Sequence, residues 1–105
     1  MTDKAMTDKQ LLFEDFADKV GSSFQIREQE LSGMSLVLRE AEPLSPAMGL
    51  RGARPPFSLI FVGKDPRVLP QRIYRLDHEQ LGELAVFLVP VGKDAEGVNY
   101  QATFN

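Results

Sequence analysis

The side chains of this sequence that could bind a partner are mostly basic, and they gather in its middle. Residues 51–75 hold six basic side chains and one acidic one, whereas the whole chain carries a net charge of -3. Such a segment can attract an acidic partner or a phosphate backbone, or it can pair with the acidic ends of its own chain. We expect the pairing within the fold, because the overall pI is near 5.1. The basic residues are Arg51, Arg54, Lys64, Arg67, Arg72 and Arg75.

These cations do not follow the pattern of a nucleic-acid-binding surface. Surfaces that bind single strands alternate basic residues with aromatic ones on which the bases stack. Only Tyr74 interleaves with the cations in this way. Nucleic acid is therefore not an expected partner.

The single histidine, His78, is the residue that a Ser-His-acid triad would need. No Gly-x-Ser-x-Gly elbow occurs, and no serine is placed by its spacing to be the nucleophile. Asp77, Glu79 and Glu83 could join His78 at a metal, but adjacent residues of a strand point to opposite faces and a zinc site needs converging ligands. We expect His78 to hydrogen-bond the backbone of a turn. The sequence predicts no catalytic residue, no metal site, no cofactor and no enzyme.

Composition indicates one domain with its own core. The chain has 105 residues, of which 43% are hydrophobic and none is cysteine, which suits a reducing compartment. Its first residues are polar without an apolar signal region, and its longest apolar run is far shorter than the ~20 residues of a membrane helix. We expect a cytoplasmic protein without a membrane segment. Residues 1–9 are predicted to be a flexible extension, and residues 10–105 a single β-rich domain.

Two apolar stretches predict the central strands of this domain. Leu84 to Val89 is apolar without a break, and its Val86 and Phe87 favour a strand over a helix. Because strand side chains alternate between faces, this segment predicts a strand covered on both sides. Phe57 to Val62 has the same two-sided character, and we expect it to lie beside the first stretch.

The remaining elements complete a mainly β prediction. Apolar residues at helical spacing predict a short helix from Thr7, with a capping box and Gly21 as its C-terminal cap. The pattern gives four more strands and favours a small antiparallel six-stranded barrel or two-layer sheet, with the helix plugging one face or end. The helical face is Leu12, Phe13, Phe16 and Val20, the capping pair is Thr7 and Gln10, and the further strands are Phe24 to Leu31, Met34 to Ala41, Arg72 to His78 and Val98 to Phe104.

Two connections stand out between these elements. Residues 43–56 collect prolines and glycines and predict a long loop, which carries Arg51 and Arg54. The sequence VGKD occurs at residues 62–65 and again at 91–94, each time after an apolar strand. This repeat could be a ligand loop used twice, but we expect two hairpins that share the same glycine and aspartate turn chemistry.

Short motifs are spread along the chain from residue 13 to its last residue. They are EDF at 14–16, FSLIF at 57–61, LPQ at 69–71, YRL at 74–76 with His78, LGEL at 81–84, FLVPVG at 87–92, YQA at 100–102 and FN at 104–105. Together they resemble the pattern of a small bacterial domain family of unknown function over residues 13–105. The resemblance implies no activity and no site residues. It implies that members accompany phage-tail-like or collar-domain proteins.

We therefore expect a non-catalytic interaction or assembly protein, accessory to a phage-tail-like or surface system, which binds a protein partner or a second copy. The alternative is a small-molecule or carbohydrate binding module that uses a barrel mouth near Tyr74, His78 and Tyr100. The candidate interaction residues are Arg51, Arg54, Arg67, Arg72, Tyr74 and His78.

Overall fold

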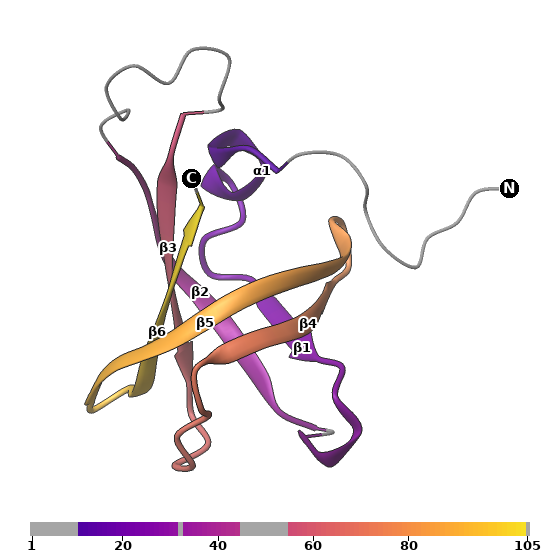
Figure 1. Cartoon of the computed structure of the whole chain (residues 1–105), viewed down its shortest axis with the longest axis vertical. Helices are drawn as coiled ribbons and strands as arrows, with labels where there is room; N and C mark the ends of the chain where they lie inside the picture. Colours follow the sequence, from indigo (N-terminus) through magenta and orange to yellow (C-terminus); the bar gives the residue numbers. More distant parts are fainter. Residues whose placement is uncertain (1–10, 32, 45–54, 105) are drawn as a thin grey trace, which may run out of the picture.

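Six antiparallel strands form a sheet that closes in a ring, with one short helix at its end, in a computed structural model of the chain (Figure 1). The ring order is β1-β2-β3-β6-β5-β4, so the predicted mainly β fold with an N-terminal helix is confirmed. The structure describes residues 11–31, 33–44 and 55–104. The elements are α1 Phe13–Ala17, β1 Ser23–Ile26, the 3-10 turn η1 Gln29–Leu31, β2 Ser35–Pro43, β3 Phe57–Gly63, β4 Arg72–His78, β5 Gly82–Asp94 and β6 Gly97–Phe104.

Several predictions fall on residues outside these ranges. The extension at residues 1–9, the capping pair Thr7 and Gln10, and most of the loop at 43–56 with Arg51 and Arg54 lie outside the described residues. Across the described ranges, no helix has the length and apolar character that crossing a membrane requires.

The hydrophobic core fills the inside of the ring. Alternate residues of each strand point inward, as the period-two pattern predicts. Burying these side chains removes them from water, which is the main term that stabilises the sheet. The inward residues include Phe24 and Ile26 of β1, Leu36 and Leu38 of β2, Phe57, Leu59 and Phe61 of β3, Tyr74 and Leu76 of β4, Leu84, Val86 and Leu88 of β5, and Tyr100 and Ala102 of β6.

The prediction that β5 is covered on both faces is wrong. Leu84, Val86 and Leu88 are buried, but Phe87 on the opposite face is 47% exposed. The expected pairing of β3 with β5 is also wrong, because β6 lies between them. The ring has one inside, so an apolar residue on the outer face of a strand is covered only if another element packs on it.

Helix α1 is shorter than predicted and covers one end of the ring. It begins at Phe13, and Asp15 accepts a hydrogen bond from the backbone N–H of Leu12 at 2.8 Å. The rings of Phe13 and Phe16 lie 6.3 and 5.8 Å from that of Phe57, and Figure 1 places α1 beside the C-terminal end of β6. Val20 is 50% exposed, because the helix ends before it.

The predicted strand from Phe24 to Leu31 ends early. After Ile26 the backbone N–H of Arg27 bonds to the carbonyl of Arg75 on β4, and η1 follows with local hydrogen bonds. β1 therefore pairs with β2 on one side and with β4 on the other, and its pairing with β4 closes the ring.

The connection from β3 to β4 crosses the opposite end of the ring (Figure 1). The Tyr100 hydroxyl accepts a hydrogen bond from the backbone N–H of Leu69 at 3.0 Å, and the buried side chain of Leu69 joins the core. The expectation that residues 62–65 open a hairpin is wrong, because β3 and β4 do not pair. Residues 91–94 do lead into a hairpin, that of β5 and β6.

Candidate functional site

Two surface features stand out once the fold is known, and the first is an apolar pair on the outer face of β4 and β5. Ile73 and Phe87 are directly opposite each other in the antiparallel register, and they are 60% and 47% exposed. Val89 follows Phe87 on the same face, and Val91 is 53% exposed. We call Ile73, Ala85, Phe87 and Val89 the β4–β5 outer face.

Charged side chains of both signs border this face. The Arg75 guanidinium lies 3.8 Å from a carboxylate oxygen of Glu28 and 3.8 Å from one of Glu83. Arg72 lies 3.9 Å from Glu28 and stacks over the ring of Tyr74 at 4.6 Å. The expected pairing of basic residues from the middle of the chain with acidic residues from its ends is therefore found at Arg72 and Arg75.

The other predicted site residues are mostly structural. Tyr74 and Tyr100 are core residues whose rings are almost fully buried. The Tyr74 hydroxyl donates to the carbonyl of Pro70 at 2.6 Å, and burial raises the pKa of this phenol. Neither ring is presented to a ligand, so they do not form the mouth that the carbohydrate-binding alternative needs. Arg67 pairs with Asp65 within its own loop.

His78 holds a turn, as expected. The backbone N–H groups of Gln80 and Leu81 donate to its Nδ1 at 3.0 and 3.2 Å, and the side chain is buried. Nδ1 therefore carries no proton, and the neutral ring bears its proton on Nε2. Burial lowers the pKa of His78 from its ordinary value of 6.5, and nearby Lys19 adds to this effect.

A serine that sequence spacing did not reveal lies against this histidine. Ser22 Oγ is 2.9 Å from His78 Nε2 and also donates to the carbonyl of Lys19. Because Nε2 carries the proton, the histidine donates to the serine, whereas a nucleophilic serine must donate to its base. The geometry is therefore that of a structural hydrogen bond.

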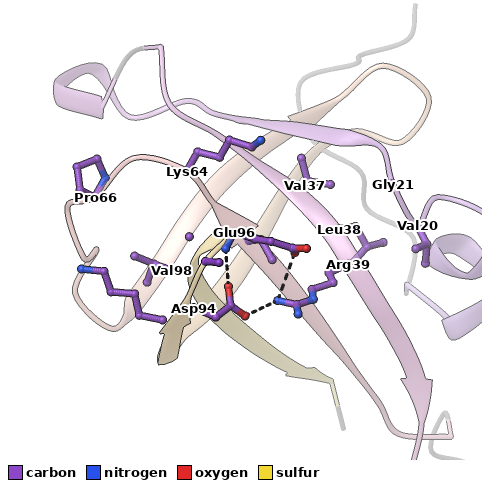
Figure 2. Close-up of a pocket in the computed structure, with 14 residues that line it drawn as sticks. Val20, Gly21, Val37, Leu38, Arg39, Lys64, Pro66, Asp94, Glu96 and Val98 are labelled. Carbon is purple, nitrogen blue, oxygen red and sulfur yellow. Dashed lines mark hydrogen bonds and ion pairs between the residues drawn. The ribbon is translucent and has the colours of Figure 1, made fainter.

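The second surface feature is a cleft on the outside of β2, β3 and β6 (Figure 2). Its volume is about 770 Å³, and we call it the Val37–Val62 cleft after two valines that face each other across β2 and β3. Val20 and Val98 add to the apolar lining. Figure 2 shows Lys64 along one side and Arg39, Asp94 and Glu96 on the other.

An ion-pair network ties the tip of the β5–β6 hairpin to β2 beside this cleft. Arg39, which lies at the bulge of β2, donates to Asp94 at 3.1 Å and to the side-chain oxygen of Asn99 at 2.8 Å. Asp94 also accepts from the Asn99 amide at 3.2 Å and from the Glu96 backbone N–H at 2.9 Å. These hydrogen bonds, that of Asn99 first, lower the pKa of Asp94 to about 2.

Both copies of the VGKD repeat border the cleft. Val62 and Lys64 come from the first copy, and Lys93 and Asp94 from the second. In each copy the aspartate accepts a hydrogen bond from the backbone N–H two residues later, Arg67 or Glu96, at 2.9 Å. The shared turn chemistry is confirmed. The repeat was visible in the sequence, but its convergence on one surface needed the pairing of β3 with β6.

Within the described residues, no group of three or more histidine, cysteine or carboxylate side chains is placed to hold a metal. The two candidate contact features of the described residues are the apolar outer face and the charged cleft.

The fold and these surfaces define a small antiparallel β-domain with a closed ring and two candidate contact regions. The chain belongs to the family described as a domain of unknown function, DUF6916, whose pattern matches residues 11–104. No curated protein and no solved structure matches the chain.

Proposed function

We propose that this protein is a non-catalytic assembly protein that associates with a second copy of itself through the β4–β5 outer face. The observation that carries the proposal is the exposure of Ile73 and Phe87 as a cross-strand pair. Two large apolar side chains side by side on a sheet lose contact with water only when another surface packs on them. The helix that could have covered the sheet lies at the end of the ring instead.

The charges around the face favour a second copy as the partner. Arg75, on the same face of β4 as Ile73, lies there between Glu28 and Glu83, so the border carries both signs. In a two-fold symmetric dimer, both copies use the same patch for the contact. A border that carries both charge signs can then place positive groups of one copy against negative groups of the other. A partner of a single charge sign would meet repulsion along part of this border.

Solution mass across a dilution series tests the self-association. We expect the wild-type protein to sediment as a dimer that dissociates on dilution, and the double variant Ile73→Ser with Phe87→Ser to be a monomer throughout. Val68→Ser is the matched control, because Val68 is 56% exposed but lies outside the face. A monomeric wild type at every concentration, or a double variant that dimerises like the control, would overturn the proposal.

The setting we propose for this assembly is a phage-tail-like or surface system, and it rests on the sequence resemblance alone. Its test is to identify the proteins that co-purify with the chain from its native cell. Components of such a system should be recovered with the wild type.

The second candidate function is ligand binding, and the observation that favours it is the Val37–Val62 cleft of about 770 Å³. The site therefore differs from the expected barrel mouth at Tyr74, His78 and Tyr100. The lining of the cleft contains no aromatic side chain on which a sugar ring could stack.

A further inference from the structure

The Val37–Val62 cleft continues into a second hollow along the surface. A depression of about 370 Å³ adjoins it and shares three of its lining residues, Val37, Val62 and Lys64. The second hollow extends past Met34 and Ser35 at the start of β2. The two hollows therefore form one groove, and Lys64 lines both parts of it.

The floor of the groove is apolar and its borders are charged. Val37 and Val62 are paired across β2 and β3, and Val98 of β6 lies beyond them. Ligand sites commonly combine an apolar lining with a few charged or polar groups that fix the orientation of the ligand. A segment that carries both apolar and charged side chains fits this combination.

The acidic residues of the groove are mostly paired with arginines, and its lysines are not paired. Asp65 forms a two-pronged ion pair with Arg67, and Asp94 and Glu96 share Arg39, which leaves one negative charge there against the two positive charges of Lys64 and Lys93. Within the described part of the chain, neither the side chain of Lys64 nor that of Lys93 forms a hydrogen bond or an ion pair. Two unmatched positive charges therefore flank the floor, and they would attract carboxylates.

Backbone contacts and turns hold the borders of the groove in place. A Cβ added at Gly97 would lie 2.2 Å from the carbonyl oxygen of Gly63, so the first VGKD segment is in direct backbone contact with the start of β6, which follows the second segment. The aspartate turn in each segment and the Arg39 network hold the lysine-bearing loops. A preorganised site loses less conformational entropy when a ligand binds.

We propose that this groove binds an extended acidic peptide, whose apolar side chains lie on Val37 and Val62 and whose carboxylates pair with Lys64 and Lys93. This binding site is separate from the β4–β5 outer face and does not depend on self-association. The repeated VGKD sequence then has a function in addition to its turn chemistry: it supplies one lysine to each side of the site.

The chemistry of the groove favours a peptide over a nucleic acid. Proteins that hold single strands use aromatic side chains for base stacking, and none of the described residues that line the groove is aromatic. A continuous phosphate backbone would also have to pass the one negative charge that remains where Asp94 and Glu96 share Arg39. A peptide can place its separate carboxylates at the two lysines and keep apolar groups between them.

Fluorescence anisotropy with a short labelled peptide of alternating glutamate and valine tests this proposal. We expect saturable binding that weakens with added salt, and amide chemical-shift changes at Val37, Val62 and Gly97 in the labelled protein. Lys64→Gln and Lys93→Gln should each weaken binding roughly two- to fivefold, and the double variant about tenfold, as expected for exposed ion pairs.

Arg27→Gln is the matched control for net charge. Arg27 is an exposed cation paired with Asp77, and it does not line the groove, so its loss should leave peptide affinity unchanged. The proposal is overturned if the peptide does not bind, if the lysine variants behave like Arg27→Gln, or if an oligothymidylate of matched charge binds as tightly as the peptide. A peptide in which serine replaces valine should bind more weakly, and equal affinity would also contradict the proposed use of the apolar floor.

Discussion

At the scale of single residues, the donor and acceptor roles in its hydrogen bonds determine the protonation state of His78. Its Nδ1 accepts two backbone N–H groups at the turn after β4, so Nε2 must donate to Ser22. A protonated ring would place an N–H against those two backbone donors. The ring is also buried and lies 4.5 Å from that of Phe24, so a positive charge on it would be poorly solvated. Folding therefore favours the neutral form.

This preference predicts that the protein loses stability as the pH falls below 6.5. The folded pKa of His78 is lower than the unfolded value of 6.5, so the contribution is complete above 6.5 and is lost as the pH falls through the folded pKa. His78→Phe keeps a ring but removes both nitrogens. We expect it to lower the free energy of unfolding at neutral pH by about 1–3 kcal/mol and to flatten the pH dependence.

Urea unfolding between about pH 5 and pH 8 measures this effect, because only histidine ordinarily titrates in that range. Tyr74→Phe is the control: it removes one buried hydrogen bond to Pro70 but no group that titrates there. It should lower stability and keep the wild-type pH dependence. If His78→Phe retains the wild-type slope, another group is responsible for it.

At the scale of elements, strand positions could be predicted from the sequence, but strand neighbours could not. The segment from Arg72 to His78 forms β4 with the predicted bounds, because Tyr74 and Leu76 alternate with outward-facing charges. Period-two alternation assigns side chains to the two faces of a strand, but it does not show whether another element covers the outer face. The sequence therefore predicted Phe87 to be a core residue, whereas the ring leaves it exposed.

The candidate surfaces were harder to predict than the strands. Arg72 was singled out by charge and pairs with Glu28, while Tyr74 and His78 are buried. The opposition of Ile73 to Phe87 depends on the register of β4 and β5. The convergence of Lys64 and Lys93 likewise depends on how β3, β6 and β5 are ordered, which local sequence patterns do not encode.

The contact between Gly63 of the first repeat and Gly97 at the start of β6 predicts different outcomes at two glycines of the β5–β6 hairpin. Gly97 has φ +140°, and a Cβ there would clash with the carbonyl oxygen of Gly63, whereas a Cβ at Gly92 would meet nothing within 4 Å. We expect Gly97→Ala to lower the free energy of unfolding by about 1–3 kcal/mol or more, because both backbone strain and a steric clash result. Thermal melting measures the change, and Gly92→Ala is the matched control with little expected effect. Equal melting of the two variants would show that the hairpin can move away from β3 without cost.

At the scale of the whole molecule, closure of the ring determines which surfaces can make contacts. Each described strand has two neighbours, and the ring closes where Gln25 and Ile26 of β1 meet Asp77 and Leu76 of β4. The ring is uneven: β5 starts at Gly82 but pairs with β6 only from Val89 on, whereas β3 and β6 pair along their whole length. Closure leaves fewer unpaired strand edges than an open sheet would, so the side chains on the outer faces provide most of the surface for contacts.

Closure also predicts that the ring folds as one cooperative unit, with β6 as an essential member. Deleting residues 100–105 removes most of the strand between β3 and β5, and with it the Tyr100 hydroxyl that binds Leu69 and the Phe104 ring stacked 4.7 Å from Phe57. β3 and β5 would then have free edges, and the core would open to water between them. We expect the truncated chain to show no cooperative transition in calorimetry, with exposed strands that promote aggregation.

A deletion at the other end of the chain provides the comparison. Removing residues 1–9, which the sequence predicts to be an extension outside the domain, should leave one transition with an unchanged midpoint. If the chain without residues 100–105 also melts in a single transition at the wild-type temperature, β6 is not required for closure. The remaining strands would then have to bury the core by themselves. We do not expect this, because β6 pairs with β3 along one edge and with β5 along the other.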